Sequence, residues 1–598
     1  MKKFFLNALS SFVGAWIAIV LAGIVAVIII MGIVGNIIGS KATTISDKSV
    51  LEINLEGTIV ERDDAADISV ITFITQDMSK PQCLETIVTA IQEAKTNEKV
   101  KAIYLDCGQL SAAPATLQAI RTALEDFKSS GKKIYAYADN MSQGAYYVAT
   151  IANEISLNPA GSVTLAGLGG QSLFYKDLFD KIGVEFQAVR VGKGKAAIEP
   201  YTQDTMSNVA RQQTMQLLDT LWYQIKSDIA LSRKALTPDR IDSLINIDYV
   251  SLKSAEYVHK AHIVDMLEYR HQFEERLARN IGQDGDKLED CIQPEELALQ
   301  APTESANAKN QIAVLYACGG IDDMMGGGGI NSTTLVPQIL DLANDDNVKA
   351  LVLRVNSPGG SAFGSEQIWE ALETFKQTGK PFVVSMGDYA ASGGYYISCG
   401  ADRIFANPMC ITGSIGIFGL IPNIAGLMDK LGVNVELVAT NPNGVFPALF
   451  TPLTEQQLQA MQGMVENGYE LFVSRCAEGR HMEVDKIKEI ADGRPLPAVM
   501  ALNFGLVDEL GGLDKAIKYA AEKAKLKDYN RVNYPETTMS LINLLADVQQ
   551  SSARIVGFVN LFTYGDVNKY SESARQLLNG FKEQNMIRAE ASPIRVTL

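Results

Sequence analysis

The sequence predicts an α/β fold of two tandem domains, each built from stacked βαβ units. One transmembrane helix is predicted before the first domain. The chain has 598 residues, which is too long for a single hydrophobic core. Short Val- and Ile-rich runs alternate with longer amphipathic segments, as in a buried parallel sheet covered by helices. One pattern of residues also occurs twice, which indicates a duplicated domain.

The transmembrane helix is predicted from an uncharged apolar run over residues 12–34, which is long enough to cross a bilayer. Residues 35–41, directly after it, make a poor signal-peptide cleavage site. Residues 1–40 are therefore interpreted as a short cytoplasmic stub and a retained signal anchor. Lys2 and Lys3 favour a cytoplasmic N-terminus, which would place the rest of the chain across the membrane.

The duplication is visible in segments that recur at a nearly constant spacing. Val100–Leu105 (VKAIYL) and Val348–Leu353 (VKALVL) lie 248 positions apart, and Gly144–Tyr147 (GAYY) and Gly393–Tyr396 (GGYY) lie 249 positions apart. A constant spacing over many segments indicates two copies of one domain. The predicted domains are a first repeat over 48–282, a linker over 283–308, a second repeat over 309–525 and a C-terminal extension over 526–598.

Composition excludes some classes of partner and cofactor. The net charge of −16 argues against nucleic acid, because a phosphate-binding surface needs an excess of basic residues. The seven cysteines are scattered and form neither a CxxC pair nor a metal-ligand spacing, so they are interpreted as small core residues. No metal and no cofactor is expected.

Ser392 lies in a turn of small residues, Gly387–Tyr396 (GDYAASGGYY), after the strand-like run Phe382–Met386. A serine on a strand-to-helix turn can present its hydroxyl to a substrate, with neighbouring amides directed at the same place. Close packing of a helix on a sheet is the alternative explanation for the small residues. The first copy has Gln143 at the matching position, so packing does not need the hydroxyl there.

Two other segments have also diverged between the copies. Asn356–Ser361 (NSPGGS) follows a predicted strand, and its two glycines allow main-chain N–H groups to face a ligand. The first copy has no glycine pair at this place. Ser414, within Thr412–Gly416 (TGSIG), corresponds to Leu165.

The first copy carries Lys195 where the second copy has Gly444. A lysine acts as a general base only when it is neutral, and burial lowers the pKa of a lysine from about 10.4. The residues around Lys195 are small or apolar and would not solvate an ammonium group. Lys193 is the alternative base, and an ordinary surface charge is the alternative interpretation.

Five segments together, four of them described above, resemble signal peptide peptidase A, in the long tandem-domain form of that membrane-anchored serine protease family. The resemblance covers most of the chain and implies the fold shared by Clp proteases and crotonases, and a homotetramer. Residues 493–499 depart from the family pattern, and no role is assigned to them. The matching segments are Lys195–Pro200, Asn356–Ser361, Ala391–Tyr396, Thr412–Gly416 and Gly505–Gly512.

The resemblance implies a role for each residue of a Ser/Lys dyad. Ser392 would be the nucleophile and Lys195 the general base. Ser414 would orient the lysine, and the main-chain N–H groups of Gly360 and Gly393 would form the oxyanion hole. The sequence leaves open whether Lys195 reaches Ser392 in its own chain or in a neighbouring one.

The implied function is that of a serine endopeptidase of the bacterial inner membrane, with its catalytic domains on the periplasmic side. Its expected substrates are signal peptides left after protein export and other apolar peptides. A crotonase-like acyl-CoA enzyme and a non-catalytic membrane scaffold are the alternatives from other classes. A Ser-His-Asp triad is the chemical alternative, but no histidine adjoins the small-residue motifs. The chain has four: His259, His262, His271 and His481.

Overall fold

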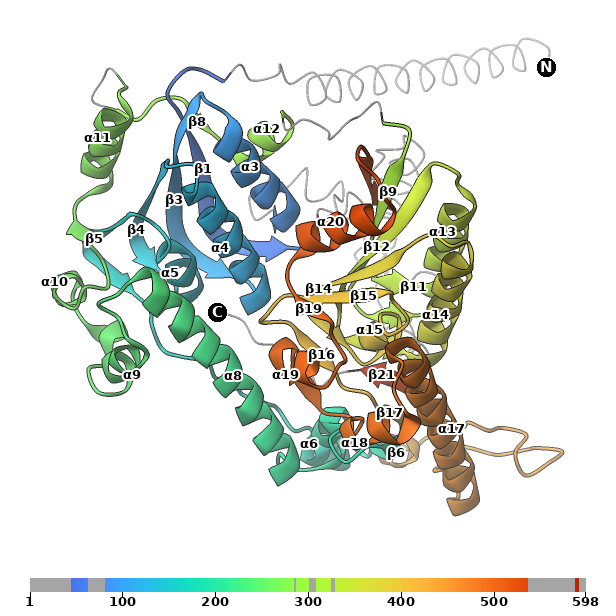
Figure 1. Ribbon diagram of the computed structural model, residues 1–598. Coiled ribbons are helices and arrows are strands. Elements are labelled where there is room, and N and C mark those ends of the chain that lie inside the picture. The colour runs from blue at the N-terminus through green and yellow to red at the C-terminus, as the bar shows by residue number, and fades with distance from the viewer. Residues whose placement is uncertain are drawn as a thin grey trace, which may run out of the picture.

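The computed structural model of the protein describes residues 45–62, 81–283, 287–300, 308–323, 329–535 and 587–590 (Figure 1). The predicted transmembrane segment lies outside these ranges. Within them, no helix is both long enough and apolar enough to cross a membrane. The two copies form two lobes that lie side by side, coloured blue to green and yellow to red in Figure 1.

The first copy is built around a parallel sheet of seven strands, because its apolar runs are buried on both faces. Its helices include α3 (Leu84–Thr96), α4 (Pro114–Lys128), α5 (Gln143–Ala149), α6 (Lys176–Ile182), α7 (Glu199–Thr202), α8 (Asn208–Ser232), α9 (Pro238–Asn246), α10 (Ala255–Lys260) and α11 (Arg270–Ile281). The strand order is β2 (Gln82–Cys83), β1 (Ser49–Val60), β3 (Val100–Ser111), β4 (Lys133–Met141), β5 (Glu154–Val163) and β7 (Met266–Leu267), and β8 (Cys291–Ile292) pairs with β1.

The predicted linker includes ordered elements that pack on the first copy. Strand β8 adds to β1, and Leu297 of α12 (Pro294–Ala298) lies in the core of the first copy. The linker therefore contributes to the first lobe in its described part.

The second copy repeats this architecture with an eight-stranded sheet. Its helices include α13 (Ser332–Asn344), α14 (Ala362–Gln377), α15 (Gly393–Tyr396), α16 (Ala425–Lys430), α17 (Glu455–Arg480), α18 (Val484–Ile490), α19 (Ala498–Asn503) and α20 (Leu513–Lys523). The strand order is β18 (Pro495–Pro497), β16 (Ile411–Gly413), β14 (Phe382–Ala391), β12 (Val348–Ser357), β9 (Gln311–Cys318) and β20 (Asn530–Tyr534), and β15 (Arg403–Ala406) pairs with β14 and with β19 (Glu509–Leu510).

The central strand β12 explains why this sheet needs helices on both faces. Leu351 and Leu353 belong to the larger core of the second copy, whereas Ala350 and Val352 belong to a separate core that includes Ile517 of α20. Both faces of the strand are thus apolar and buried. The predicted α/β fold with two tandem domains is confirmed.

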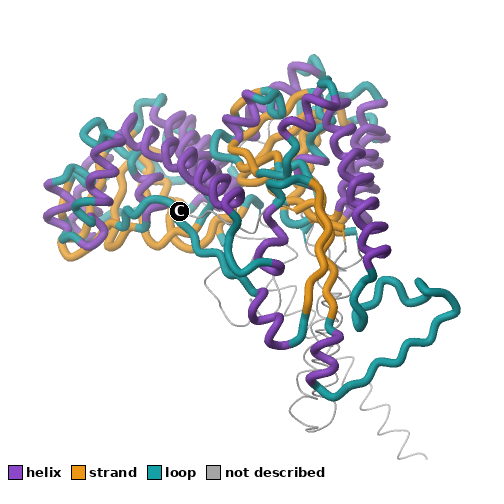
Figure 2. Tube along the Cα trace, turned by 90° about the horizontal axis from the view of Figure 1, so that it is seen from below, coloured by secondary structure: helices purple, strands orange, loops and turns teal. Residues whose placement is uncertain are grey.

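A third sheet joins segments from both copies and from the C-terminal extension. Strand β6 comes from the first copy but pairs antiparallel with β17 of the second copy, at the base of the molecule in Figure 1 and seen from below in Figure 2. The strand order is β11 (Ile330–Asn331), β10 (Ile321–Asp322), β13 (Gly359–Ser361), β21 (Ile587–Glu590), β17 (Ile417–Asn423) and β6 (Glu185–Val191).

A buried polar network also connects the copies. Arg354 on β12 makes two hydrogen bonds to the carboxylate of Glu61, at 2.7 and 3.1 Å, and both side chains are only 6% exposed. Asp388 accepts hydrogen bonds from the main-chain N–H and the hydroxyl of Thr116, at 2.8 and 2.7 Å. Asn356 donates to Asp388 at 3.1 Å, so the network extends to the glycine turn of the second copy.

Removal of one partner of the buried ion pair is expected to destabilise the protein strongly. In Glu61→Ala, Arg354 would keep its charge in a dry site, which costs about 3–5 kcal/mol. The double variant Glu61→Leu/Arg354→Met removes both charges and should lose much less stability. Calorimetric unfolding measures the difference, with Glu256→Ala as a control for an exposed pair that should leave Tm unchanged. A double variant less stable than Glu61→Ala would contradict this expectation.

Candidate active site

Strand β6 carries Lys195 from the first copy into the second. β6 pairs with β17 over its full length, from Glu185 opposite Asn423 to Val191 opposite Ile417. Lys195 follows four residues after the end of β6 and is only 1% exposed. The alternative base, Lys193, is exposed. A lysine of the first copy is thus buried among residues of the second.

Ser392 has an unusual backbone conformation at the end of β14. Its φ is +57° and its ψ is −115°, which lies outside the left-handed helical region that non-glycine residues with positive φ usually adopt. The turn is fixed by its N–H, which donates to the carbonyl of Gly413 at 2.7 Å, and by its carbonyl, which accepts from the N–H of Tyr396 at 2.9 Å. Although Ser392 is the N-cap of α15, its hydroxyl makes no capping hydrogen bond. Such strain is concentrated at functional sites.

The structure brings Lys195, Ser392 and Ser414 together within one chain. Lys195 Nζ lies 2.6 Å from Ser392 Oγ, 3.0 Å from the carbonyl oxygen of Ser414 and 3.2 Å from Ser414 Oγ. The Ser414 hydroxyl donates to the carbonyl of Gly493 at 3.0 Å. Because a hydroxyl has one proton, its oxygen is left to accept a hydrogen bond from Lys195. All three side chains are buried.

The two glycines predicted as oxyanion donors lie in turns that touch each other. Gly393 is the first residue of α15, so its N–H has no intrahelical acceptor. A Cβ atom at Gly393 would lie 2.7 Å from Ser365 Oγ and 3.2 Å from the Cα of Gly359. A Cβ atom at Gly360, where φ is +158°, would lie 2.1 Å from the carbonyl oxygen of Ile321. Close backbone approach therefore requires glycine at both positions.

In the matching turn of the first copy, the side chain of Gln143 hydrogen-bonds to the main chain of a neighbouring loop. Gln143 Oε1 accepts from the N–H groups of Ala166 and Gly167, each at 2.8 Å, and Nε2 donates to the carbonyl of Gly167 at 3.0 Å. Ser142 caps α5 by accepting from the N–H of Ala145. Gln143 has no positive φ. Packing of the turn is thus achieved in the first copy without a buried hydroxyl next to a lysine.

The segment Asp492–Arg494 lies against Lys195 and its neighbours. The sequence assigns no role to residues 493–499. Besides the Gly493 carbonyl, the carbonyl of Arg494 accepts from the N–H of Ser414 at 2.9 Å, and the carbonyl of Asp492 accepts from the N–H of Gly194 at 2.7 Å. All of these acceptors are main-chain carbonyls. Only the glycine at 493, where φ is +89°, could have drawn attention to this segment in the sequence.

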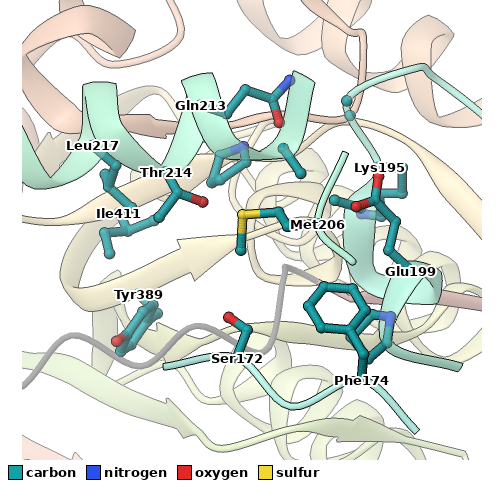
Figure 3. Close-up of a pocket in the computed structure, with 16 residues that line it drawn as sticks. Ser172, Phe174, Lys195, Glu199, Met206, Gln213, Thr214, Leu217, Tyr389 and Ile411 are labelled. Carbon is teal, nitrogen blue, oxygen red and sulfur yellow. The ribbon is translucent and has the colours of Figure 1, made fainter. Parts of the chain in front are cut away.

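A pocket lies beside Lys195, between the two copies. In Figure 3, Lys195 and Glu199 are at one end of it, and Leu217 and Ile411 are at the other, with Met206 between them. Its lining is mainly apolar and combines residues of the loop before α6, of α8 and of the second copy. Such a lining suits apolar groups.

Strand β21 lies between β13, which contains Gly360, and β17. It is antiparallel to both strands, with Ala589 opposite Gly360 and Ile587 opposite Gly419. Neighbouring strands are about 4.8 Å apart, so without β21 a gap of one strand would separate β13 from β17. We define this gap as the strand slot. It accepts extended backbone beside Gly360, and in this structure the chain's own C-terminal segment occupies it.

Substitution of Gly493 is expected to displace Lys195. A Cβ atom at this position would lie 2.8 Å from both the N and the Cβ atoms of Lys195. Gly493→Ala should therefore slow the reaction of Ser392 with a fluorophosphonate probe by about tenfold or more, the effect of a shift near 1 Å. The control is Gly463→Ala, because a Cβ atom there meets nothing within 4 Å. Equal labelling rates in Gly493→Ala and the unmodified chain would refute this prediction.

Comparison with known proteins places the chain among proteases. Residues 126–281 and 374–527 match Peptidase family S49, and residues 324–411 match Clp protease. A ClpP1 mutant from Listeria monocytogenes covers 34% of this chain and 94% of its own, with 16% identity and a TM-score of 0.24.

Several curated relatives are similar over most of the chain. Protease 4 of Salmonella typhi is 35% identical over 489 residues, which cover 80% of this chain and 78% of that protein. Protease 4 of Haemophilus influenzae is 33% identical over 539 residues and 86% of each chain. The putative signal peptide peptidase SppA of Enterococcus faecium is 33% identical over 251 residues, 40% of this chain and 72% of that protein. With two matched segments in tandem and relatives of this similarity, the chain belongs to Peptidase family S49, in the group that includes Protease 4 and SppA.

Proposed function

We propose that this protein is a membrane-anchored serine endopeptidase that degrades signal peptides left after protein export and other apolar peptides. Ser392 is the nucleophile and Lys195 the general base. The observation that carries the proposal is the 2.6 Å contact between Lys195 Nζ and Ser392 Oγ, two buried side chains from different copies. Membership of a protease family assigns the reaction to peptide hydrolysis.

To act as a base, Lys195 must be a neutral amine, which has two N–H donors and one lone pair. The carbonyl and the hydroxyl oxygen of Ser414 accept the two donors. The lone pair is then available for the proton of Ser392. Lys195 takes this proton as Ser392 attacks the peptide carbonyl, and returns it to the leaving amine. Water frees the acyl group by the reverse sequence, with Lys195 again as base.

The negative charge that develops on the substrate oxygen needs preorganised donors. The N–H groups of Gly360 and Gly393 are proposed to supply them, because their turns touch each other beside Ser392. Ser414 acts through Lys195 and is a positioning residue. Its own hydroxyl is fixed by Gly493, so the amine is oriented by groups that do not react.

The strand slot supports a peptide as the substrate. An extended peptide can pair with β13 on one side and with β17 on the other, as β21 does in this structure. Main-chain pairing is largely independent of side-chain identity, which suits an enzyme with varied substrates. The apolar pocket next to Lys195 is proposed to receive apolar side chains.

The location proposed for the enzyme follows from residues 12–34 and from its bacterial relatives. These residues would anchor it in the inner membrane by a single span, with the N-terminus in the cytoplasm and the catalytic domains in the periplasm. The proposed assembly is a homotetramer. Released signal peptides are apolar, so a protease fixed at the membrane surface would meet them there.

Loss of either dyad residue is expected to abolish peptide hydrolysis. Ser392→Ala removes the nucleophile and Lys195→Ala removes the base, and each should lower kcat by about 10⁴-fold or more. The measurement is cleavage of an apolar peptide, with circular dichroism as a check on folding. Lys193→Ala is the matched control, because this neighbouring lysine is exposed and should not affect the rate.

Two outcomes would contradict a dyad formed within one chain. Full activity in either variant would exclude the residue concerned. Restored activity on mixing the two variants would show that the pair forms between chains, whereas the proposal has it within one chain, where Lys195 Nζ lies 2.6 Å from Ser392 Oγ. Turnover of a CoA thioester by the unmodified enzyme, without peptide cleavage, would favour the crotonase-like alternative.

Removal of β21 is expected to make the strand slot more accessible. If β21 occupies the slot in some of the molecules, only the remaining molecules can bind a peptide. The apparent affinity for peptide is then lowered in proportion to the fraction of molecules with a free slot. Deletion of residues 587–598 should therefore lower KM for a peptide substrate and leave kcat unchanged. Addition of a synthetic peptide with the sequence of residues 585–592 should raise KM again. An unchanged KM in the shortened chain would count against competition for the slot.

A further inference from the structure

We propose that Cys399 and Cys476 form a disulfide bond as the chain folds in the periplasm. Both residues are thiols in this structure. The bond would join α17 to the turn that follows α15, the short helix that begins directly after Ser392. Disulfides persist in oxidising compartments, so the bond depends on the periplasmic location proposed above.

The two thiols lie next to each other in the core of the second copy. Helices α15 and α17 are in contact and lie side by side in Figure 1. Near this contact, the thiols of Cys399 and Cys476 are hydrogen-bonded to each other. Both side chains are 0% exposed and belong to one apolar cluster. Cysteines in direct contact are already near the short separation that a disulfide requires.

Contacts on either side of this pair fix the two segments against each other. One turn before Cys476, the ring of Phe472 stacks on that of Tyr396, with ring centroids 4.3 Å apart. One turn after Cys476, a Cβ atom at Gly479 would lie 2.2 Å from the carbonyl oxygen of Cys399. Residues three or four apart share one face of a helix. Cys476 is therefore on the face of α17 that meets the turn of Cys399.

The first copy shows that this turn does not need a thiol. Thr150 lies 249 positions before Cys399, and its hydroxyl donates to the carbonyl of Tyr147 at 2.8 Å. The Cys399 thiol makes the matching bond to the carbonyl of Tyr396 at 3.1 Å. A hydroxyl thus supports the turn equally well. The thiol adds one property that a hydroxyl lacks, the capacity to form a covalent bond with a second thiol.

The bond would form by thiol–disulfide exchange with a disulfide-bearing oxidant. The thiolate of one cysteine attacks the disulfide of the oxidant, which gives a mixed disulfide and releases one thiol. The thiolate of the other cysteine then attacks the mixed disulfide and displaces the second thiol. The two cysteines together lose two electrons and two protons, and the oxidant is reduced from a disulfide to two thiols.

Burial determines when this exchange can take place. Burial, followed by the contact with Cys399, raises the pKa of the Cys476 thiol well above its usual value. Because the thiolate is the nucleophile, the buried thiols are unreactive in the folded chain. The oxidant must therefore act before α17 packs on the turn of Cys399. Once the chain has folded, the same burial would protect the disulfide from reductants.

The disulfide would stabilise the part of the second copy that contains the candidate site. It closes a loop of about 80 residues, which restricts the unfolded chain. This loop includes Ser414 and strand β17, the partner of β6. The bond would thus act on the same segments that position Lys195.

Alkylation of the denatured chain tests the bond. Full-length protein purified from bacterial membranes and denatured in iodoacetamide should carry two fewer modified cysteines than the seven in its sequence. Digestion without reductant should release one pair of peptides linked through Cys399 and Cys476. Cys410→Ala is the matched control, because it removes another buried cysteine and should keep the linked pair. Complete modification without reductant, or a different linked pair, would overturn the proposal.

Refolding separates the pairing of the cysteines from the location of the chain. The reduced and denatured chain is refolded in detergent with a mixture of glutathione and glutathione disulfide, and the same linked peptides should form. No linked pair in this mixture would overturn the pairing itself. A linked pair here but not in protein from cells would overturn the periplasmic location and the bond in cells. Peptide cleavage is measured separately, so neither result depends on the proposed dyad.

Thermal unfolding gives a second test. Cys399→Ala and Cys476→Ala break the same bond, so each should lower Tm by about 5 °C or more. The double variant should lower Tm by about as much as either single variant, because the bond is lost only once. Losses that add in the double variant would overturn the proposal.

Discussion

The antiparallel pairing of β6 with β17 is the contact on which the candidate site depends. It adds a strand of the first copy to a sheet that contains strands of the second, and its main-chain hydrogen bonds set the register. A slip of one residue would turn every side chain to the opposite face. Lys195 follows closely after this strand, so the register determines where its amine arrives. Backbone pairing thus brings a lysine into a dry site that its charged form would avoid.

The buried network around Asp388 secures the other half of the site. Asp388 lies on β14, four residues before Ser392, and it is hydrogen-bonded to Thr116 of the first copy and to Asn356. Burial, followed by the nearby Glu61 carboxylate, raises the pKa of Asp388 above the ordinary range of a carboxyl group. These hydrogen bonds join β14 to the first copy. Ser392 is therefore positioned relative to both copies.

The α/β fold is predictable because apolar residues recur at the spacing of strands and helices along the chain. The duplication is predictable because similar segments of sequence recur at a nearly constant spacing. Lys195, Ser392 and Ser414 can be identified as candidates because the equivalent position in the other copy has a different residue. That difference shows that packing of the shared fold does not require these side chains. Three features are not predictable: the pairing of β6 with a strand of the second copy, the position of β21 between β13 and β17, and the hydrogen bonds to the carbonyls of Asp492–Arg494. Pairing between distant segments has no local signature, and main-chain acceptors are the same in every residue type. The predicted membrane segment lies outside the described residues.

The division of the site between Lys195 and Ser392 also affects which substitutions the chain can accept. In an assembly of identical single-repeat chains, every substitution would appear at all equivalent positions at once. Here the position equivalent to Lys195 is Gly444, and the position equivalent to Ser392 is Gln143, whose side chain fastens its own turn. Each half of the duplication is thus free to change without its counterpart. One chain can then contain the turn of Ser392 beside Lys195 and the purely structural turn of Gln143.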